Sequence, residues 1–266
     1  MTRHFSRTVL IAVPAALAVA CAPVQGEPAT TETVADAVRV LDPCALVPED
    51  SLGDGEILQY GSAVQATVCA ALVRRPDGTE VRVELSLLPS SFARSDGPDL
   101  ARGLCERTFT VPGGHGSVRV AEVPGVDTCD AAQAVADGAA AILDAGEGRR
   151  GPTDPLATDP CSVLDAPVPG PPGPPRPFHC SDDAGTSVDL SLRTVSDRGH
   201  SDEPVVGPDG CTRVIPVGKE IDITREDVDV DEFARSLGRA HVVVTVRATN
   251  CGTLATVAER VERAFA

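Results

Sequence analysis

The stretch VRVELSL, residues 81–87, alternates apolar and polar side chains, and the alternation returns in VDLSLR, residues 188–193. Successive side chains of a strand point to opposite faces, so this period predicts one buried face and one solvent-facing face. Such strands are typical of an antiparallel sheet packed on one side. In the second stretch we expect Val188, Leu190 and Leu192 to face inward. The outward residues would then be Asp189, Ser191 and Arg193.

Further landmarks recur around these stretches, in the same order in each half of the chain. DPCALV at 42–47 returns as DPCSVL at 159–164. Two further cysteines recur in register, one ahead of an arginine and one opening a helical segment: Cys105 and Cys129 in the first half, Cys211 and Cys251 in the second. An ordered recurrence of this kind predicts a tandem duplication. We expect repeat unit one over residues 41–145, repeat unit two over residues 159–266, and a linker rich in Gly, Pro and charge at 146–158.

Each unit has the same expected order of elements. The Asp-Pro-Cys motif opens a helical turn, because proline suits a first helical position. A strand carrying the second cysteine follows, at about residues 66–73 in unit one. The alternating strand comes next, and a third strand follows the third cysteine. A fourth strand includes residues 118–120 in unit one and residues 241–246 in unit two.

Each unit is expected to end in an amphipathic helix. In unit two the apolar side chains fall at i, i+3, i+4, i+7, i+10 and i+11, at Leu254, Val257, Ala258, Val261, Ala264 and Phe265. The corresponding residues of unit one are Ala132, Val135, Ala136, Ala139, Ile142 and Leu143. Thr253 or Asn250 is the candidate cap of the second helix. These patterns predict an α+β fold of two tandem small domains, each an antiparallel sheet packed against a C-terminal amphipathic helix and stapled by disulfides.

Eight cysteines fall four to each unit, and none lies in the C-x-x-C spacing of structural zinc sites. Their even number, together with an export signal, favours disulfides. Each unit allows three pairings, and we favour joining the first cysteine to the second and the third to the fourth. The predicted bridges are Cys44–Cys69, Cys105–Cys129, Cys161–Cys180 and Cys211–Cys251.

The N-terminus has the composition of an export signal. Arg3 and Arg7 precede an apolar run at 8–20 that is too short to span a bilayer as a helix. Small residues then lead directly to Cys21. This arrangement resembles the lipobox of bacterial lipoproteins, in which the cysteine is acylated and becomes the mature N-terminus. We therefore expect a signal peptide at 1–20, lipidation of Cys21, and a lipid-anchored disordered stalk at 21–40 that is too polar to bury a core.

The expected location is the outer face of the cytoplasmic membrane, held by the lipid anchor. The alternative is ordinary signal cleavage, which would leave Cys21 as a free thiol on a secreted protein. An exposed free thiol is a liability in an oxidising compartment, which favours lipidation.

The lipobox, the Asp-Pro-Cys openings and the closing helices together resemble the small secreted lipoproteins of actinobacteria, whose domain has no assigned function. Related extracellular sensor domains occur on some actinobacterial serine/threonine kinases. Members often carry Trp two residues after the second cysteine, where this chain has Ala71 and Asp182. The resemblance covers each unit separately. It implies a role in the cell envelope and names no chemistry.

Composition excludes several classes of partner. The formal net charge is −16 at pH 7, so the surface repels nucleic acid and anionic lipid headgroups, and we expect no nucleic-acid partner. There is no Trp, Tyr60 is the only Tyr, and aromatic residues make up 3% of the chain. Sites for sugars and for single-stranded nucleic acid usually use aromatic side chains as stacking platforms. Both kinds of site are therefore disfavoured.

No G-x-S-x-G, S-x-x-K or H-E-x-x-H motif occurs in the chain. The Gly-rich residues 113–117 are interpreted as a turn. Asp227, Asp229 and Asp231 alternate like the start of a calcium loop, but glutamate and glycine occupy its sixth and twelfth positions, which favours a solvated acidic loop. The proline-rich residues 167–177 are interpreted as a stiff surface loop.

Three histidines do not lie at a spacing typical of metal ligands. They are His179, His200 and His241, and each is interpreted as a surface or core side chain. The sequence therefore predicts no catalytic, cofactor or metal site residue. We expect a non-catalytic cell-envelope lipoprotein that binds or senses an unknown ligand or partner protein, with the cleft between the two units as the favoured site. The alternatives are an envelope-associated hydrolase and a structural spacer protein.

Overall fold

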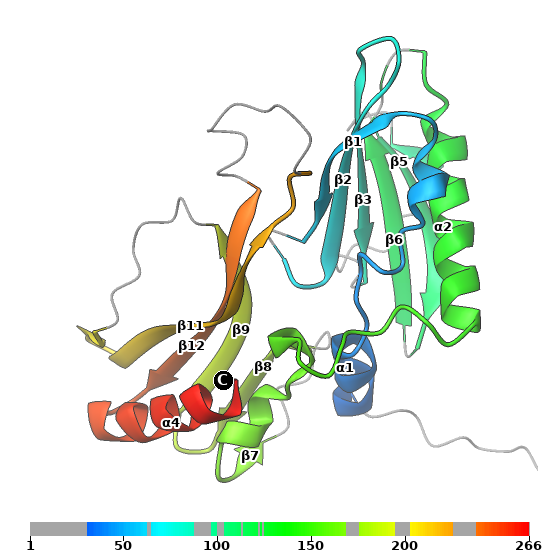
Figure 1. The fold of residues 1–266 in the computed structure, drawn as a ribbon. Coiled ribbons are helices and arrows are strands. Elements are labelled where there is room, and N and C mark those ends of the chain that lie inside the picture. The colour runs from blue at the N-terminus through cyan, green and yellow to red at the C-terminus, as the bar shows by residue number, and fades with distance from the viewer. Residues whose placement is uncertain are drawn as a thin grey trace, which may run out of the picture.

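The computed structural model describes residues 31–62, 65–87, 97–99, 104–112, 114–121, 123, 125–168, 176–194, 203–225 and 238–265. It is a mixed α+β fold with two antiparallel sheets and four disulfides, as the sequence predicted, and each sheet has six strands (Figure 1). Cys21 and the signal peptide lie outside the described residues. So do His200 and the acidic loop around Asp229.

The first sheet is built from the N-terminal half of the chain. Its strand order is β1 (Glu56–Gly61), β2 (Val68–Arg74), β3 (Glu80–Ser86), β6 (Gly114–Ala121), β5 (Leu104–Val111) and β4 (Gly97–Asp99). Helix α2 (Thr128–Asp144) packs on β5 and β6. The alternating strand β3 contributes Val83 and Leu85 to the core, where they pair with Val120 and Val118 of β6. The helix buries Ala132, Val135, Ala136 and Ala139 against them.

The second sheet is built from the C-terminal half. Its strand order is β10 (Val205–Gly207), β11 (Gly210–Asp222), β12 (Arg239–Ala248), β9 (Ser187–Thr194), β8 (His179–Asp182) and β7 (Pro167–Val168). Helix α4 (Cys251–Ala264) packs on β11 and β12. Val188, Leu190 and Leu192 are buried, which confirms the predicted inward face of β9. The helix buries Leu254, Val257, Ala258 and Val261, with Phe265 just beyond its end.

The four disulfides join the cysteines in the predicted pairs: Cys44–Cys69, Cys105–Cys129, Cys161–Cys180 and Cys211–Cys251. Their Cα–Cα separations run from 5.0 to 5.3 Å, inside the normal range for a bridged pair. In each half, one bridge ties the opening Asp-Pro-Cys segment to a strand, and the other ties a strand to the start of the packed helix.

The aspartate of each Asp-Pro-Cys motif caps its own turn. The Asp159 carboxylate accepts a hydrogen bond of 3.0 Å from the backbone N–H of Cys161 and begins the 3₁₀ helix η3 (Pro160–Val163). Asp42 accepts the equivalent bond of 2.9 Å from Cys44. Capping of this kind satisfies a backbone donor that the turn itself leaves free. The cap therefore fixes the turn that holds the first cysteine of each half beside the strand that carries its disulfide partner.

The prediction of a disordered stalk at 21–40 is wrong for its last part, residues 31–39. Thr31–Arg39 forms helix α1, and Val38 is only 1% exposed. The segment is polar overall, but one stripe of an amphipathic helix can be buried while the rest stays in water. The linker at 146–158 is also ordered, because it contains the 3₁₀ helix η2 (Pro155–Ala157), whose Leu156 packs into the second hydrophobic core.

The Gly-rich turn lies earlier than expected. The predicted turn at 113–117 falls largely in β6, and Val111 pairs with Gly114 at the end of the β5–β6 hairpin. Gly116 faces the Phe109 ring across the sheet, and a Cβ at this position would overlap that ring. The glycine is therefore required by close packing against an aromatic side chain.

Candidate functional site

A groove lies between the two halves of the molecule, in the region that we favoured for a site. Its volume is about 420 Å³, within the range of small-ligand pockets. Residues 65–67, which precede β2, form the part contributed by the first half. Residues 176–179 and 189–192, from the start of β8 and from β9, form the part contributed by the second half.

The groove exists because β8 is shorter than the strand beside it. The two strands pair as far as His179 opposite Asp189, and the Leu190 N–H then donates a bond of 2.8 Å to the Phe178 carbonyl. Beyond that point the chain of β8 turns away, while β9 continues to Thr194. Among the described residues, no strand lies beside the last part of β9 on this side.

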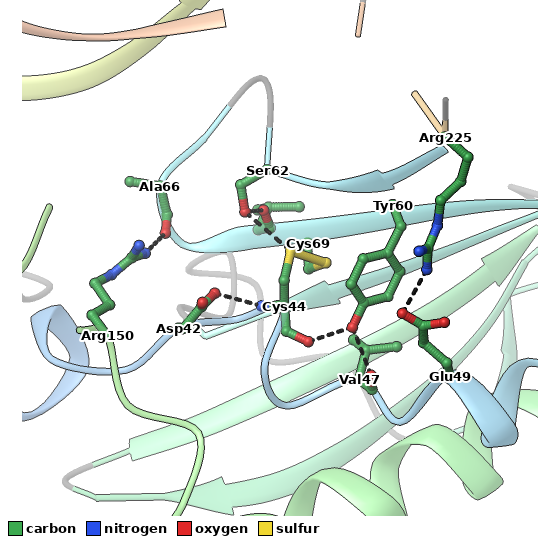
Figure 2. Close-up of a disulfide and its surroundings, with 11 residues drawn as sticks. Asp42, Cys44, Val47, Glu49, Tyr60, Ser62, Ala66, Cys69, Arg150 and Arg225 are labelled. Carbon is green, nitrogen blue, oxygen red and sulfur yellow. Dashed lines mark hydrogen bonds and ion pairs between the residues drawn. A yellow bond between two sulfur atoms is a disulfide. The ribbon is translucent and has the colours of Figure 1, made fainter. Parts of the chain in front are cut away.

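A buried arginine joins the two walls of the groove. The Arg150 guanidinium donates a bond of 2.6 Å to the Ala66 carbonyl (Figure 2). It forms an ion pair of 2.9 Å with Asp154. It also lies over the Phe178 ring, 6.0 Å from its centre. Its side chain is only 5% exposed, so the charge depends on these partners. Arg150 therefore links the first half to the turn before β8.

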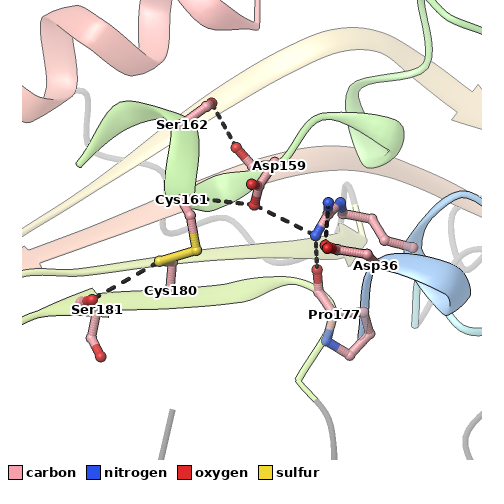
Figure 3. A network of polar contacts seen from close by, with 8 residues as sticks. Asp36, Asp159, Cys161, Ser162, Pro177, Cys180 and Ser181 are labelled. Carbon is pink, nitrogen blue, oxygen red and sulfur yellow. Dashed lines mark hydrogen bonds and ion pairs between the residues drawn. A yellow bond between two sulfur atoms is a disulfide. The ribbon is translucent and has the colours of Figure 1, made fainter. Parts of the chain in front are cut away.

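A second buried arginine fixes the same turn to α1. The Arg39 guanidinium contacts Asp36 at 2.6 Å, Asp159 at 3.5 Å and the Pro177 carbonyl at 3.4 Å (Figure 3). Asp159 is the capping residue of the second Asp-Pro-Cys motif. The helix that replaces part of the predicted stalk thus helps to hold one wall of the groove.

The two halves also meet at a separate strand joint. Residues that follow β11 add to the free edge of β1, where Thr224 bridges Gln59. The Tyr60 N–H donates a bond of 2.7 Å to the Ile223 carbonyl, and the Arg225 N–H donates one of 3.1 Å to the Leu58 carbonyl. The first sheet therefore gains a short pairing from the second half of the chain.

Tyr60 anchors this joint from the side of the first sheet. Its hydroxyl lies 2.6 Å from the Cys44 carbonyl and 2.7 Å from the Val47 carbonyl, while the Arg225 guanidinium lies 5.6 Å from its ring centre (Figure 2). Arg225 also pairs with Glu49. Burial, followed by the nearby carboxylates of Glu49 and Asp42, raises the pKa of Tyr60 to about 12, against the opposing effect of Arg225.

The described side chains that line the groove include one arginine and one carboxylate. The one carboxylate among the described lining residues, Asp189, lies 2.6 Å from His179 Nδ1 and 2.7 Å from the Arg247 guanidinium. Arg176 also lines the groove and is exposed, and no carboxylate among the described residues pairs with it. Because Asp189 is paired while Arg176 has no described carboxylate partner, the groove favours a ligand with a negative group.

Sequence patterns did not identify the groove residues. The sequence predicts a surface or core side chain for His179, and the register that sets Cys180 opposite Val188 also sets His179 opposite Asp189. The pairing of β8 with β9 is the signal that would have found the pair, and the sequence alone does not fix that register. His241 is placed elsewhere, with its Nε2 3.6 Å from Glu220, and His115 is exposed on β6.

The eight cysteines are all bridged and none lines the groove. The described residues contain no cluster of three or more His, Cys, Asp or Glu side chains suited to a metal ion. Within the same residues, no helix has the length and apolar character needed to cross a bilayer. The chain matches no protein-family model, no curated protein and no solved structure.

Proposed function

We propose that the chain is a non-catalytic cell-envelope lipoprotein that binds a ligand or partner protein in the groove between its two halves. The observation that carries this proposal is the groove itself, about 420 Å³ in volume and lined from both halves. The buried Arg39 and Arg150 hold its walls together, so the site is formed before any ligand arrives.

The proposed architecture is a pair of tandem domains of common origin. The repeated Asp-Pro-Cys motifs, the matching disulfide pattern and the helix on each sheet support it. The resemblance to secreted actinobacterial lipoproteins and kinase sensor domains supports a binding or sensing role over an enzymatic one. A duplicated module creates a shared groove that one copy alone would lack.

The proposed location is the outer face of the cytoplasmic membrane, with a lipid on Cys21 as the anchor. The apolar segment before Cys21 supports export, and disulfides persist in oxidising compartments outside the cytosol. Mass spectrometry of the mature protein tests this directly. An acylated Cys21 at the N-terminus is expected, and a free thiol there would leave only secretion.

Affinity capture with a groove-blocking variant tests the binding role. Full-length lipoprotein from its own membrane fraction is compared with Ser191→Trp, which places an indole in the groove. Ser187→Trp is the matched control, because Ser187 lies on the same face of β9 but does not line the groove. A species captured by the wild type and by the control, but reduced at least about tenfold in Ser191→Trp, supports the proposal. Equal capture by all three proteins contradicts it.

A second candidate, an envelope-associated hydrolase, is favoured by one observation. His179 and Asp189 form a hydrogen-bonded pair of 2.6 Å in the groove, and Ser191 follows on the same face of β9. These are the three residue types of a serine nucleophile site, in which the described contact joins His179 to Asp189. A fluorophosphonate probe should then label the wild type and fail to label Ser191→Ala. Absence of labelling in the wild type favours the non-catalytic role.

A further inference from the structure

We propose that the groove binds an extended acidic peptide, which adds as a strand to the open edge of β9 and places a carboxylate against Arg176. This inference rests on the binding role proposed above and names the class of ligand. Strand addition uses backbone hydrogen bonds for affinity and alternate side chains for selectivity. Four features of the groove support it: an open strand edge, the reason the edge is open, its charge and its apolar lining.

The open edge centres on Leu192. The Leu190 N–H faces β8 and bonds to Phe178, so the backbone groups of Leu192, two residues later, face the same side. No described residue bonds to the Leu192 N–H or carbonyl there. On its other side β9 is fully paired with β12 from Ser187 to Thr194. Within the described part of the chain, this donor and this acceptor therefore have no partner and border the groove.

The chain cannot fill this edge with its own β8. By register, the residue that would pair with Leu192 is Arg176, but its carbonyl accepts a bond of 3.2 Å from the His179 N–H. Pro177, which follows, has no N–H, and its carbonyl faces the Arg39 guanidinium at 3.4 Å. The Arg176 and Pro177 carbonyls in this turn therefore accept hydrogen bonds from other groups. An added segment would take the position that β8 leaves.

Charge selects an acidic occupant. Asp189 is matched by His179 and Arg247, while Arg176 has no described partner and is exposed on the groove. A glutamate or aspartate side chain of a peptide beside Leu192 would come within reach of the Arg176 guanidinium. A basic peptide would meet like charge at the same position, so the groove should discriminate by sign.

The lining fits alternate side chains of a strand. Phe178 and Pro177 offer apolar contact, while Ser191 and Gln65 offer hydrogen-bonding groups. Successive residues of an extended peptide point in opposite directions, so apolar and acidic residues in alternation match both kinds of lining. The volume of about 420 Å³ limits the buried part to a short segment.

Single-amide hydrogen exchange on the full-length lipoprotein tests the proposal. The probe is a pool of blocked pentapeptides with Glu at positions two and four and Val, Ile, Leu or Ala elsewhere. We expect the pool to slow exchange of the Leu192 amide by at least about tenfold. Peptides N-methylated at the central residues lose backbone donors and should have no such effect, and a Lys-containing pool should bind more weakly.

Variants separate the charge contact from the backbone contact. Arg176→Gln should weaken binding of the acidic pool about threefold to tenfold, whereas Arg263→Gln, which removes the same charge from the exposed end of α4, should leave it unchanged. Unchanged exchange at Leu192 with every peptide overturns the proposal. If Ser191→Trp still abolishes capture of a native ligand, the binding role stands and only the peptide class is wrong. If capture also survives in that variant, both proposals fail.

Discussion

At the scale of single residues, a few side chains connect segments that are far apart in the sequence. Arg150 bonds to Ala66 and lies over Phe178, and Tyr60 bonds to the carbonyls of Cys44 and Val47. Each of these polar groups is at least partly buried, so its partners decide whether it stabilises or destabilises the fold. Two predictions follow from Tyr60 and Arg150.

Titration of Tyr60 should occur well above its usual range. Burial raises its pKa from 10.0 to about 12, so the folded protein keeps the phenol neutral where the unfolded chain ionises it. Because ionisation above pH 10 then favours the unfolded chain, the contribution of this group to the free energy of unfolding is complete below pH 10 and is lost as the pH rises through about 12. Tyr60 is the only tyrosine and there is no Trp, so tyrosinate absorbance reports this group alone. A midpoint near 10 in the folded protein would contradict the described packing, and Tyr60→Phe should show no absorbance change.

Replacement of Arg150 should loosen the groove wall. In Arg150→Ala the Ala66 carbonyl loses its donor and Asp154 loses its ion pair, so we expect a loss of about 1–3 kcal/mol in the free energy of unfolding. Arg149→Ala is the control, because Arg149 is exposed, and its effect should stay within about 0.5 kcal/mol. Urea unfolding of both variants measures the difference. Equal effects would show that Arg150 does not join the two walls.

At the scale of elements, helix ends and strand edges determine the shape of the site. Asn250 accepts a bond of 2.8 Å from the Thr253 N–H and begins α4, and Asp127 does the same for α2 at 3.1 Å. The turn before β8 ends that strand early and opens the groove. Because α2 and α4 each pack on a sheet, loss of the cap at the start of either helix should lower the stability of that half.

Loss of the α4 cap should cost stability without changing the fold. Asn250→Ala leaves the Thr253 N–H without its acceptor, so we expect a loss of about 0.5–2 kcal/mol in the free energy of unfolding. Asn250→Asp retains an acceptor at the same position and should behave nearly as the wild type. Thermal unfolding followed by circular dichroism compares the three proteins. A drop as large in Asn250→Asp as in Asn250→Ala would contradict a capping role.

The elements that sequence predicted well are those with a clear period. Alternation identified β3 and β9, and the spacing of apolar residues identified α2 and α4. Strands β4, β7 and β10 have only two or three residues, too few to show a period, and β1 contains a register shift between Ile57 and Gln59. Polar composition concealed α1, in which Val38 and Arg39 are buried while Asp36 is exposed.

The groove lay beyond sequence analysis for a different reason. Its walls depend on contacts between residues such as Arg150 and Ala66, which are 84 positions apart, and on the register of β8 against β9. No local pattern reports such contacts. The repeat alone was enough to predict a site between the two halves. The residues that line the site could be identified only from the structure.

At the scale of the whole molecule, the described residues form two joints between the halves. Arg39 and Arg150 form one beside the groove, and the pairing of β1 with residues 223–225 forms the other. The groove keeps its shape only while both joints hold. The central claim is therefore that the two sheets move as one body in solution.

Exchange of the Tyr60 amide tests this claim most directly, because its hydrogen-bond acceptor, the Ile223 carbonyl, belongs to the other half. Gly61→Val is the matched variant, since a side chain at Gly61 would displace Ile223, and amides of β3 are the internal control. We predict that Tyr60 exchanges at least about a hundredfold more slowly than a free amide in the wild type and loses this protection in the variant. Exchange of Tyr60 at the free rate in the wild type, with β3 still protected, would show that the halves move independently and that the groove is not a lasting feature.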